Sequence, residues 1–207
     1  MIPKKQIDTP YHHPNLRQAL LNAAVTLVGE VGPRAFTLRE VARRAGVSHN
    51  APYRHFTSKD DLLTTVAIEG FERLTRTMLA NQGSTASPSK RLILAGCGYV
   101  EFALKWPNHF AIMFDSGAAP PNVDCTPANA GEEAFRVLLD SIIAAQQSGD
   151  LPPGDPMPHA FTAWSLVHGI AKLAIGGNLP MDHDAILNFT SIAALRMLTP
   201  HSDRAKS

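Results

Sequence analysis

The sequence has few cysteines and no long hydrophobic run, and these two absences exclude several classes of protein. Cys97 and Cys125 are the only cysteines among 207 residues. A pair without short spacing is more typical of free thiols than of a disulfide or a metal site. The longest apolar run, residues 92–100, is far shorter than the roughly 20 residues that a membrane-spanning helix needs. The first residues also lack the apolar stretch of a signal peptide. We therefore expect a cytoplasmic protein without membrane contact.

Patterns typical of sheets, metal sites and catalysis are also missing. No segment alternates convincingly between apolar and polar residues, so no β-sheet is expected. The histidines at 109, 159 and 183 lack metal-site spacing, and Gly96-x-Gly98 follows no strand, which makes it a poor phosphate loop. No paired carboxylates or activated nucleophile accompany His168, the histidine that follows Trp164 by four residues. The sequence therefore predicts no metal, no cofactor and no enzymatic activity.

Charge is distributed unevenly, although the net charge of the chain is only +1. Residues 1–60 hold nine Lys and Arg against four Asp and Glu, for a net charge of +5, and the remainder carries −4. A basic N-terminal unit joined to a mildly acidic body is typical of a protein whose head binds a polyanion. Chance clustering would give the same charges, so this pattern needs support from the motifs.

Apolar residues recur at helical spacing along most of the chain, and capping motifs mark several helix starts. These motifs are Asn15-x-x-Gln18, Thr37-x-x-Glu40 and Ser58-x-x-Asp61. We expect an all-α protein of about nine helices, with a helix-turn-helix domain at residues 14–57 and a second domain at 58–200. The predicted helices cover residues 15–31, 37–45, 48–56, 58–80, 90–106, 108–115, 131–147, 159–175 and 184–198. A loose arm precedes them, and a linker at 81–89 and a loop at 116–129 interrupt them.

The first three predicted helices form a helix-turn-helix, a unit that places its last helix in the major groove of DNA. Gly46 makes the turn before residues 48–56, here called the recognition segment. Asn50 and His49 can hydrogen-bond to base edges, while basic and hydroxyl side chains around them would hold phosphates. The residues predicted to contact DNA are Thr37, Arg43, Arg44, Ser48, His49, Asn50, Ala51, Tyr53, His55 and Lys59.

The same residues resemble the DNA-binding signature of TetR-family transcriptional regulators. The resemblance is carried by Gly46-Val47-Ser48, by Tyr53-Arg54-His55-Phe56 and by Ser58-Lys59-Asp60-Asp61-Leu62-Leu63, in the order and spacing of that family. The upstream run Phe36-Thr37-Leu38-Arg39-Glu40-Val41-Ala42 extends it over most of residues 15–63. The resemblance implies an all-helical homodimer that binds a palindromic operator. It also implies phosphate contacts from Thr37, Tyr53, His55 and Lys59.

The C-terminal body contains Trp164-Ser165-Leu166-Val167-His168-Gly169, which is similar to the W…HG motif of one TetR C-terminal subgroup. Trp164 and His168 lie four residues apart, so they share a helix face. They could line an apolar cavity that captures a small molecule, or they could be a core tryptophan beside a satisfied core histidine. The residues predicted to bind an effector are Phe71, Met78, Phe102, Trp106, Phe110, Trp164 and His168.

The sequence thus favours a homodimeric repressor that a small, largely apolar effector releases from DNA. The last two helices would form the dimer interface as a four-helix contact. The residues predicted for it are Ala160, Ala163, Val167, Ile170, Ala171, Ala174, Ile186, Phe189, Ile192, Ala193 and Leu195. An activator, a regulator without an effector and, remotely, a helical enzyme are the alternatives.

Overall fold

The structure is a computed structural model that describes residues 15–83, 86–117 and 127–198. In these ranges the chain is helical and contains no strand, as predicted. The elements are α1 (Leu16–Val31), α2 (Leu38–Arg44), the 3-10 turn η1 (Pro52–Arg54), α3 (Lys59–Gln82), α4 (Pro88–Lys105), α5 (Pro107–Asp115), α6 (Pro127–Gln147), α7 (Met157–Ile175) and α8 (His183–Leu198). None of the helices in these ranges is both long and apolar enough to cross a lipid bilayer. The predicted N-terminal arm and Cys125 lie outside the described residues.

Local capping chemistry sets the starts of α1 and α3 where the sequence predicts them. The Asn15 side chain accepts a hydrogen bond from the backbone N–H of Gln18 at 3.3 Å. Ser58 Oγ accepts from the backbone N–H of Asp61 at 3.0 Å, and the Asp61 carboxylate in turn accepts from the N–H of Thr57 at 2.8 Å. These bonds satisfy N–H groups that the first turn of a helix cannot pair internally.

Two predicted elements differ from the structure. The recognition segment is not a regular helix, because its only helical element is the three-residue 3-10 turn η1. Pro52 opens that turn, and its ring lacks an N–H with which to continue an α-helical ladder. Helix α6 begins at Pro127, whereas the loop was predicted to run to residue 129. Proline is favoured at the first position of a helix, so it starts this one instead of prolonging the loop.

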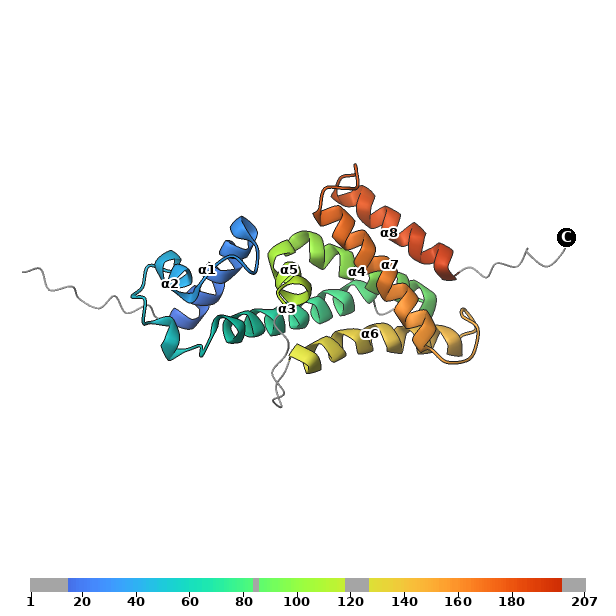
Figure 1. Cartoon of the computed structure of the whole chain (residues 1–207). Coiled ribbons are helices and arrows are strands. Elements are labelled where there is room, and N and C mark those ends of the chain that lie inside the picture. The colour runs from blue at the N-terminus through green and yellow to red at the C-terminus, as the bar shows by residue number, and fades with distance from the viewer. Residues whose placement is uncertain (1–14, 84–85, 118–126, 199–207) are drawn as a thin grey trace, which may run out of the picture.

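The helices enclose two hydrophobic cores, and α3 contributes to both. Leu62 and Val66, near its start, pack in the head with α1 and α2, while Leu74 and Met78 pack in the body with α4, α6 and α7. Figure 1 shows α1 and α2 at one end of the molecule, α3 running from them into the body, and α6, α7 and α8 at the other end. The predicted boundary at residue 57 therefore falls just before a helix that both domains share.

Helix α5 also joins the two cores. Phe110 is buried in the body core, and Ile112, two residues later, is buried in the head core. The helix approaches α1 so closely that a Cβ atom added at Gly29 would lie 2.6 Å from the Asn108 amide nitrogen. Head and body are thus connected by a packed helix as well as by the continuous α3.

Candidate functional sites

The surface of the head is built on the start of α2, where Thr37 and Glu40 cap each other. The Thr37 hydroxyl accepts from the Glu40 N–H at 3.3 Å, and the Glu40 carboxylate accepts from the Thr37 N–H at 2.7 Å. The backbone N–H of Thr37 and then its hydroxyl lower the pKa of Glu40, so the carboxylate stays ionised at neutral pH. This reciprocal arrangement fixes the entry of α2, and the Thr37 side chain remains exposed beside it.

Replacing Thr37 with alanine will remove the side-chain half of this cap. We expect the free energy of unfolding to fall by about 1 kcal/mol. For a chain of this size that corresponds to a Tm lower by roughly 2–4 °C in a thermal melt. Thr37→Ser keeps the hydroxyl and is the matched control. Equal melting temperatures for the alanine and serine variants would show that the capping bond contributes nothing.

A tight turn after α2 positions the recognition segment. Gly46 has a φ of +70°, a left-handed conformation that side chains with a Cβ rarely adopt. Its N–H donates to the Arg43 carbonyl at 3.2 Å, and the Val47 N–H donates to the Ala42 carbonyl at 3.0 Å, which satisfies the last carbonyls of α2. The chain therefore leaves α2 abruptly and presents Ser48 at the start of the next segment.

Most of the recognition segment is exposed, and one apolar anchor holds it. Phe56 is 2% exposed in the head core, and its N–H donates to the Pro52 carbonyl at 2.9 Å. The structure differs from the prediction at Ala51, which precedes η1 and is buried, so its methyl group is not available to DNA. The exposed residues are Ser48, His49, Asn50, Tyr53, Arg54 and His55. A polar, exposed turn on a fixed apolar base can approach the edges of DNA bases.

The basic residues of the head are placed differently from one another. Arg43 is exposed, whereas the Arg44 guanidinium forms an ion pair with Glu30, with one N–O distance of 2.6 Å. Lys59 Nζ donates to the carbonyls of Arg34 and Phe36, each at 3.1 Å. Lys59 thus ties the start of α3 to the loop before α2. An ammonium has three N–H donors, so one is left to approach a phosphate.

Sequence reasoning missed two exposed arginines near this surface. Arg39 lies in the first turn of α2, and Arg54 lies between Tyr53 and His55 in the recognition segment. Their positive charge, in segments already predicted to contact DNA, was the signal that could have identified them. Arginine in such positions holds phosphates by charge-assisted hydrogen bonds.

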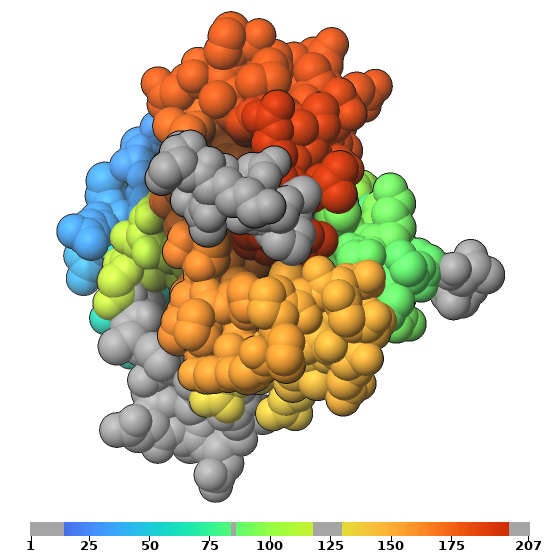
Figure 2. All heavy atoms as spheres, turned by 90° about the vertical axis from the view of Figure 1, so that its right-hand side faces the viewer, coloured from blue at the N-terminus to red at the C-terminus, as the bar shows by residue number. Residues whose placement is uncertain are grey.

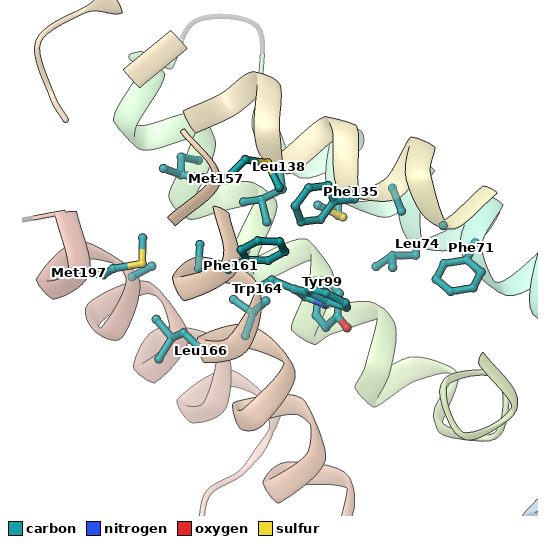
Figure 3. A pocket seen from close by; sticks show the side chains of 18 of the residues that line it. Phe71, Leu74, Tyr99, Phe135, Leu138, Met157, Phe161, Trp164, Leu166 and Met197 are labelled. Atoms are coloured by element: carbon teal, nitrogen blue, oxygen red, sulfur yellow. The ribbon is translucent and has the colours of Figure 1, made fainter. Parts of the chain in front are cut away.

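The body contains a cavity of about 460 Å³ between α3, α4, α6, α7 and α8, with Phe114 of α5 at its wall. Figure 3 shows Phe135 and Leu138 of α6 beside Phe161 and Trp164 of α7, and the Phe135 ring centroid is 5.9 Å from both of those rings. Figure 2 shows a hollow in the face where the end of α6, the start of α7 and the end of α8 meet. A cavity of this size and apolar character is typical of sites for small organic molecules.

Three of the seven predicted effector-binding residues line this cavity. Phe71, Met78 and Trp164 are among its wall residues. Phe102, Trp106, Phe110 and His168 do not line it, so this cavity gives their predicted contact with an effector no support. Phe102 and Phe110 are almost fully buried in the body core. Trp106 packs against Phe102 with ring centroids 5.4 Å apart. The apolar pattern of a helix does not reveal which buried residues face a void and which face a neighbour.

His168 lies behind the cavity wall, hydrogen-bonded to a residue that lines it. The Tyr99 hydroxyl and His168 Nδ1 are 2.9 Å apart, and Tyr99 is one of the lining residues. The rings of Phe110 and Phe114 pack on the imidazole at 5.3 and 4.8 Å between centroids. Burial, and then the charge of Lys172, lower the pKa of His168, so it is neutral at pH 7. The sequence alternative of a satisfied core histidine is the one that the structure supports.

Sequence reasoning missed most of the lining, including Tyr99. The missed residues on α6 and α7 follow helical spacing, but their contact with a void depends on how the helices are rotated. Leu74 shares the helical spacing of Phe71 and Met78. The other wall residues outside the predicted set, on α4 to α8, are Leu92, Gly96, Tyr99, Phe114, Gly131, Glu132, Ala134, Phe135, Leu138, Met157, Phe161, Ala163, Leu166, Val167, Ala194, Met197 and Leu198.

The outer faces of α7 and α8 expose large apolar side chains. Phe189 and Ile192, one turn apart on α8, are 38% and 42% exposed, and Leu173 on α7 is 48% exposed. Six of the residues predicted for the dimer interface are buried within the subunit, where α4, α7 and α8 pack together. The predicted residues that are buried are Ala160, Ala163, Val167, Ile170, Ala171 and Ile186.

Comparison with known proteins identifies relatives for both parts of the chain. Residues 20–66 match the model described as bacterial regulatory proteins, tetR family. Residues 92–194 match the model described as tetracyclin repressor-like, C-terminal domain. The HTH-type transcriptional regulator BetI of Rhizobium meliloti is 34% identical over 79 residues, covering 38% of this chain and 39% of that protein. The HTH-type transcriptional repressor Rv3405c of Mycobacterium tuberculosis is 41% identical over 58 residues, covering 28% and 31%. The chain thus spans less than two fifths of the length of either relative.

Solved structures match nearly the whole chain. A protein of unknown function from Rhodococcus sp. RHA1 has a TM-score of 0.75 and 34% identity, covering 91% of this chain and 98% of that one. AibR, solved in complex with isovaleryl coenzyme A and operator DNA, has a TM-score of 0.71 and 18% identity, covering 85% and 96%. At that identity the likeness to AibR establishes the fold alone.

Proposed function

Since the chain belongs to the TetR family of DNA-binding transcriptional regulators, we propose that it is a homodimeric repressor. It binds a palindromic operator through its recognition segments and is released when a small, largely apolar molecule occupies the body cavity. The observation that carries this proposal is the exposed, polar recognition segment on a head that is packed against a body with an apolar cavity. The repressor name of Rv3405c supports the direction of regulation.

Dimerisation is supported by the exposed apolar faces of α7 and α8. Phe189 and Ile192 of α8 and Leu173 of α7 are each more than a third exposed. Large apolar side chains grouped on one face are typical of a protein-protein interface. A two-fold axis at this face would pair α7 and α8 with their copies as a four-helix contact. Two heads about 34 Å apart would then enter successive major grooves.

Release by an effector requires the cavity to differ between the DNA-bound and free states. A ligand shifts the equilibrium only through its different affinity for the two states. The cavity wall includes Phe114 of α5, whose neighbour Ile112 lies in the head core. A ligand that displaces Phe114 would therefore act on the helix that joins body and head. AibR, with a similar fold, was solved with both isovaleryl coenzyme A and operator DNA.

The proposal is tested by selecting a cognate duplex from random DNA and measuring Kd by fluorescence anisotropy at several salt concentrations. Asn50→Ala should reduce the preference for cognate over non-cognate DNA by about 5- to 150-fold, because a base contact carries roughly 1–3 kcal/mol of discrimination. Tyr53→Ala should weaken both duplexes together, because a phosphate contact carries no sequence information.

Lys90→Ala is the control, since this exposed residue lies at the start of α4 in the body and not in the head. We expect its DNA affinity to equal that of the unmodified protein. If Asn50→Ala and Tyr53→Ala also leave both affinities unchanged, the recognition segment does not contact DNA.

A further inference from the structure

The charge of the cavity wall restricts the chemistry of its ligand. Among the described residues that line the cavity, Glu132 is the only aspartate or glutamate, and none is a lysine, an arginine or a histidine. Glu132 is exposed, near the start of α6. The only basic residue of α6 is Arg136, which is exposed one turn further along and is not part of the wall. The wall therefore offers one negative charge and no positive one.

The polar groups of the wall are also engaged with other residues. The Tyr99 hydroxyl is hydrogen-bonded to His168 behind the wall, and in Figure 3 it points away from the surrounding apolar side chains. Burial raises the pKa of Tyr99, so the phenol stays neutral and provides no charge for a ligand. The Trp164 indole N–H is hydrogen-bonded to Tyr99, and apart from Glu132 the remaining lining side chains, such as Leu74, Phe135 and Leu138, are apolar.

An anionic ligand would lose hydration in this cavity without gaining a partner. A buried carboxylate or phosphate needs hydrogen-bond donors or a cation to replace water. The described wall has no cation, its two side-chain donors, the Tyr99 hydroxyl and the Trp164 indole N–H, are already engaged with His168 and with Tyr99, and the Glu132 carboxylate would repel a negative group at its edge. A positively charged group on a ligand would instead be attracted to the wall. It would lie near Glu132 and near aromatic rings of the wall, among them Phe71, Phe135 and Phe161, and aromatic rings attract cations.

We infer that the cavity selects a lipophilic molecule that is neutral or positively charged and excludes anions, including fatty acids and acyl thioesters of coenzyme A. This inference rests on the proposed function, because it concerns the effector of the same cavity. It separates this chain from AibR, whose fold it shares and which was solved with isovaleryl coenzyme A.

Three probes with the same alkyl chain test the inference: decanol, decyltrimethylammonium and decanoate. Their affinities for the full chain are measured by isothermal titration calorimetry at pH 7, below the concentrations at which they form micelles. We expect decanol and decyltrimethylammonium to bind, and decanoate to bind at least about tenfold more weakly than decanol, since an unpaired charge in an apolar site is costly. Decanoate binding as tightly as decanol would overturn the inference.

Glu132→Gln identifies the charge responsible. We expect the variant to bind decyltrimethylammonium about two- to fivefold more weakly and decanoate more tightly, with decanol unchanged, because an exposed ion pair contributes little more than this. Glu133→Gln is the matched control, since Glu133 is its exposed neighbour on α6 and is not part of the wall. Equal effects of both variants would contradict a specific role of Glu132.

Parallel anisotropy measurements with operator DNA separate the two proposals. If decanoate binds best and releases DNA, the proposed function stands and the charge selectivity is wrong. If none of the probes binds while DNA binding is intact, the cavity is not a site for lipophilic ligands, and both the effector in the proposed function and the inference fail.

Discussion

Ile192→Asp will convert the dimer into a monomer and lower operator affinity by at least about 100-fold. Ile192 is 42% exposed on the outer face of α8, one turn from Phe189. Because the dimer is two-fold symmetric, the substitution puts two aspartates into one interface. Each carboxylate would lose its hydration there without gaining a partner, which opposes dimerisation. A monomer binds a single half-site and forgoes the gain of roughly 10²–10⁴ that a linked second head provides. Analytical ultracentrifugation and anisotropy on one operator duplex measure the two effects.

Leu79→Asp is the control for this prediction. Leu79 is an isomer of isoleucine in its side chain and is 52% exposed on α3. Its replacement by aspartate therefore changes charge and size as Ile192→Asp does, but on another surface. We expect this variant to remain dimeric and to keep its operator affinity. If Ile192→Asp sediments as a dimer with unchanged operator affinity, the outer face of α8 is not the interface, and another surface must pair the heads.

The head could be predicted largely because its determinants are local. The capping pairs at Thr37 and Ser58 act over three or four residues, and Gly46 provides a conformation that most residues avoid. The recognition segment was less predictable. Pro52 can open an α-helix or a 3-10 turn, and over so few residues the two have nearly the same sequence pattern. Hydrophobic spacing detects that a segment is helical more readily than it detects the kind of turn.

The cavity could be predicted only in part because it depends on helix rotation. Trp164 lines it and His168, one turn away on the same helix, does not. Their separation of four residues turns the side chains by about 40° relative to each other, enough to place His168 against Tyr99 and not in the void. Tyr99 and Phe102 differ in the same way on α4. No spacing within one helix specifies how that helix is turned against its neighbours.

The connection between cavity and head depends on α5 more than the sequence indicated. Phe110 is buried in the body core and Ile112 in the head core, and Phe114 continues the helix to the cavity wall. Protein interiors are close-packed, so a displacement of one side of such a helix is transmitted to the other. If α5 carries the signal, loosening its contact with the head should weaken the response to a ligand more than it weakens ligand binding itself.

Ile112→Ala tests this connection and is the second large effect that we expect. Ile112 is 1% exposed, and removing its buried methyl groups should lower the free energy of unfolding by about 2–5 kcal/mol in a urea titration. The void left by the shortened side chain would let the head move independently of α5. The decrease in operator affinity that decanol causes in the unmodified protein, expected at about 5- to 150-fold, should then become several-fold smaller. Calorimetry should still show decanol bound with nearly unchanged affinity, because Ile112 does not line the cavity.

Ile112→Val separates this coupling from a general loss of stability. Removing one methyl group should cost only about 0.5–1.5 kcal/mol and leave the response to decanol close to that of the unmodified protein. A further comparison is Ile142→Ala, a buried residue of α6 in the body core that is also not part of the cavity wall. It should destabilise the chain by a similar amount without touching the contact between α5 and the head. If Ile142→Ala reduces the response to decanol as strongly as Ile112→Ala does, the effect comes from stability alone, and α5 is not the element that connects the ligand to DNA.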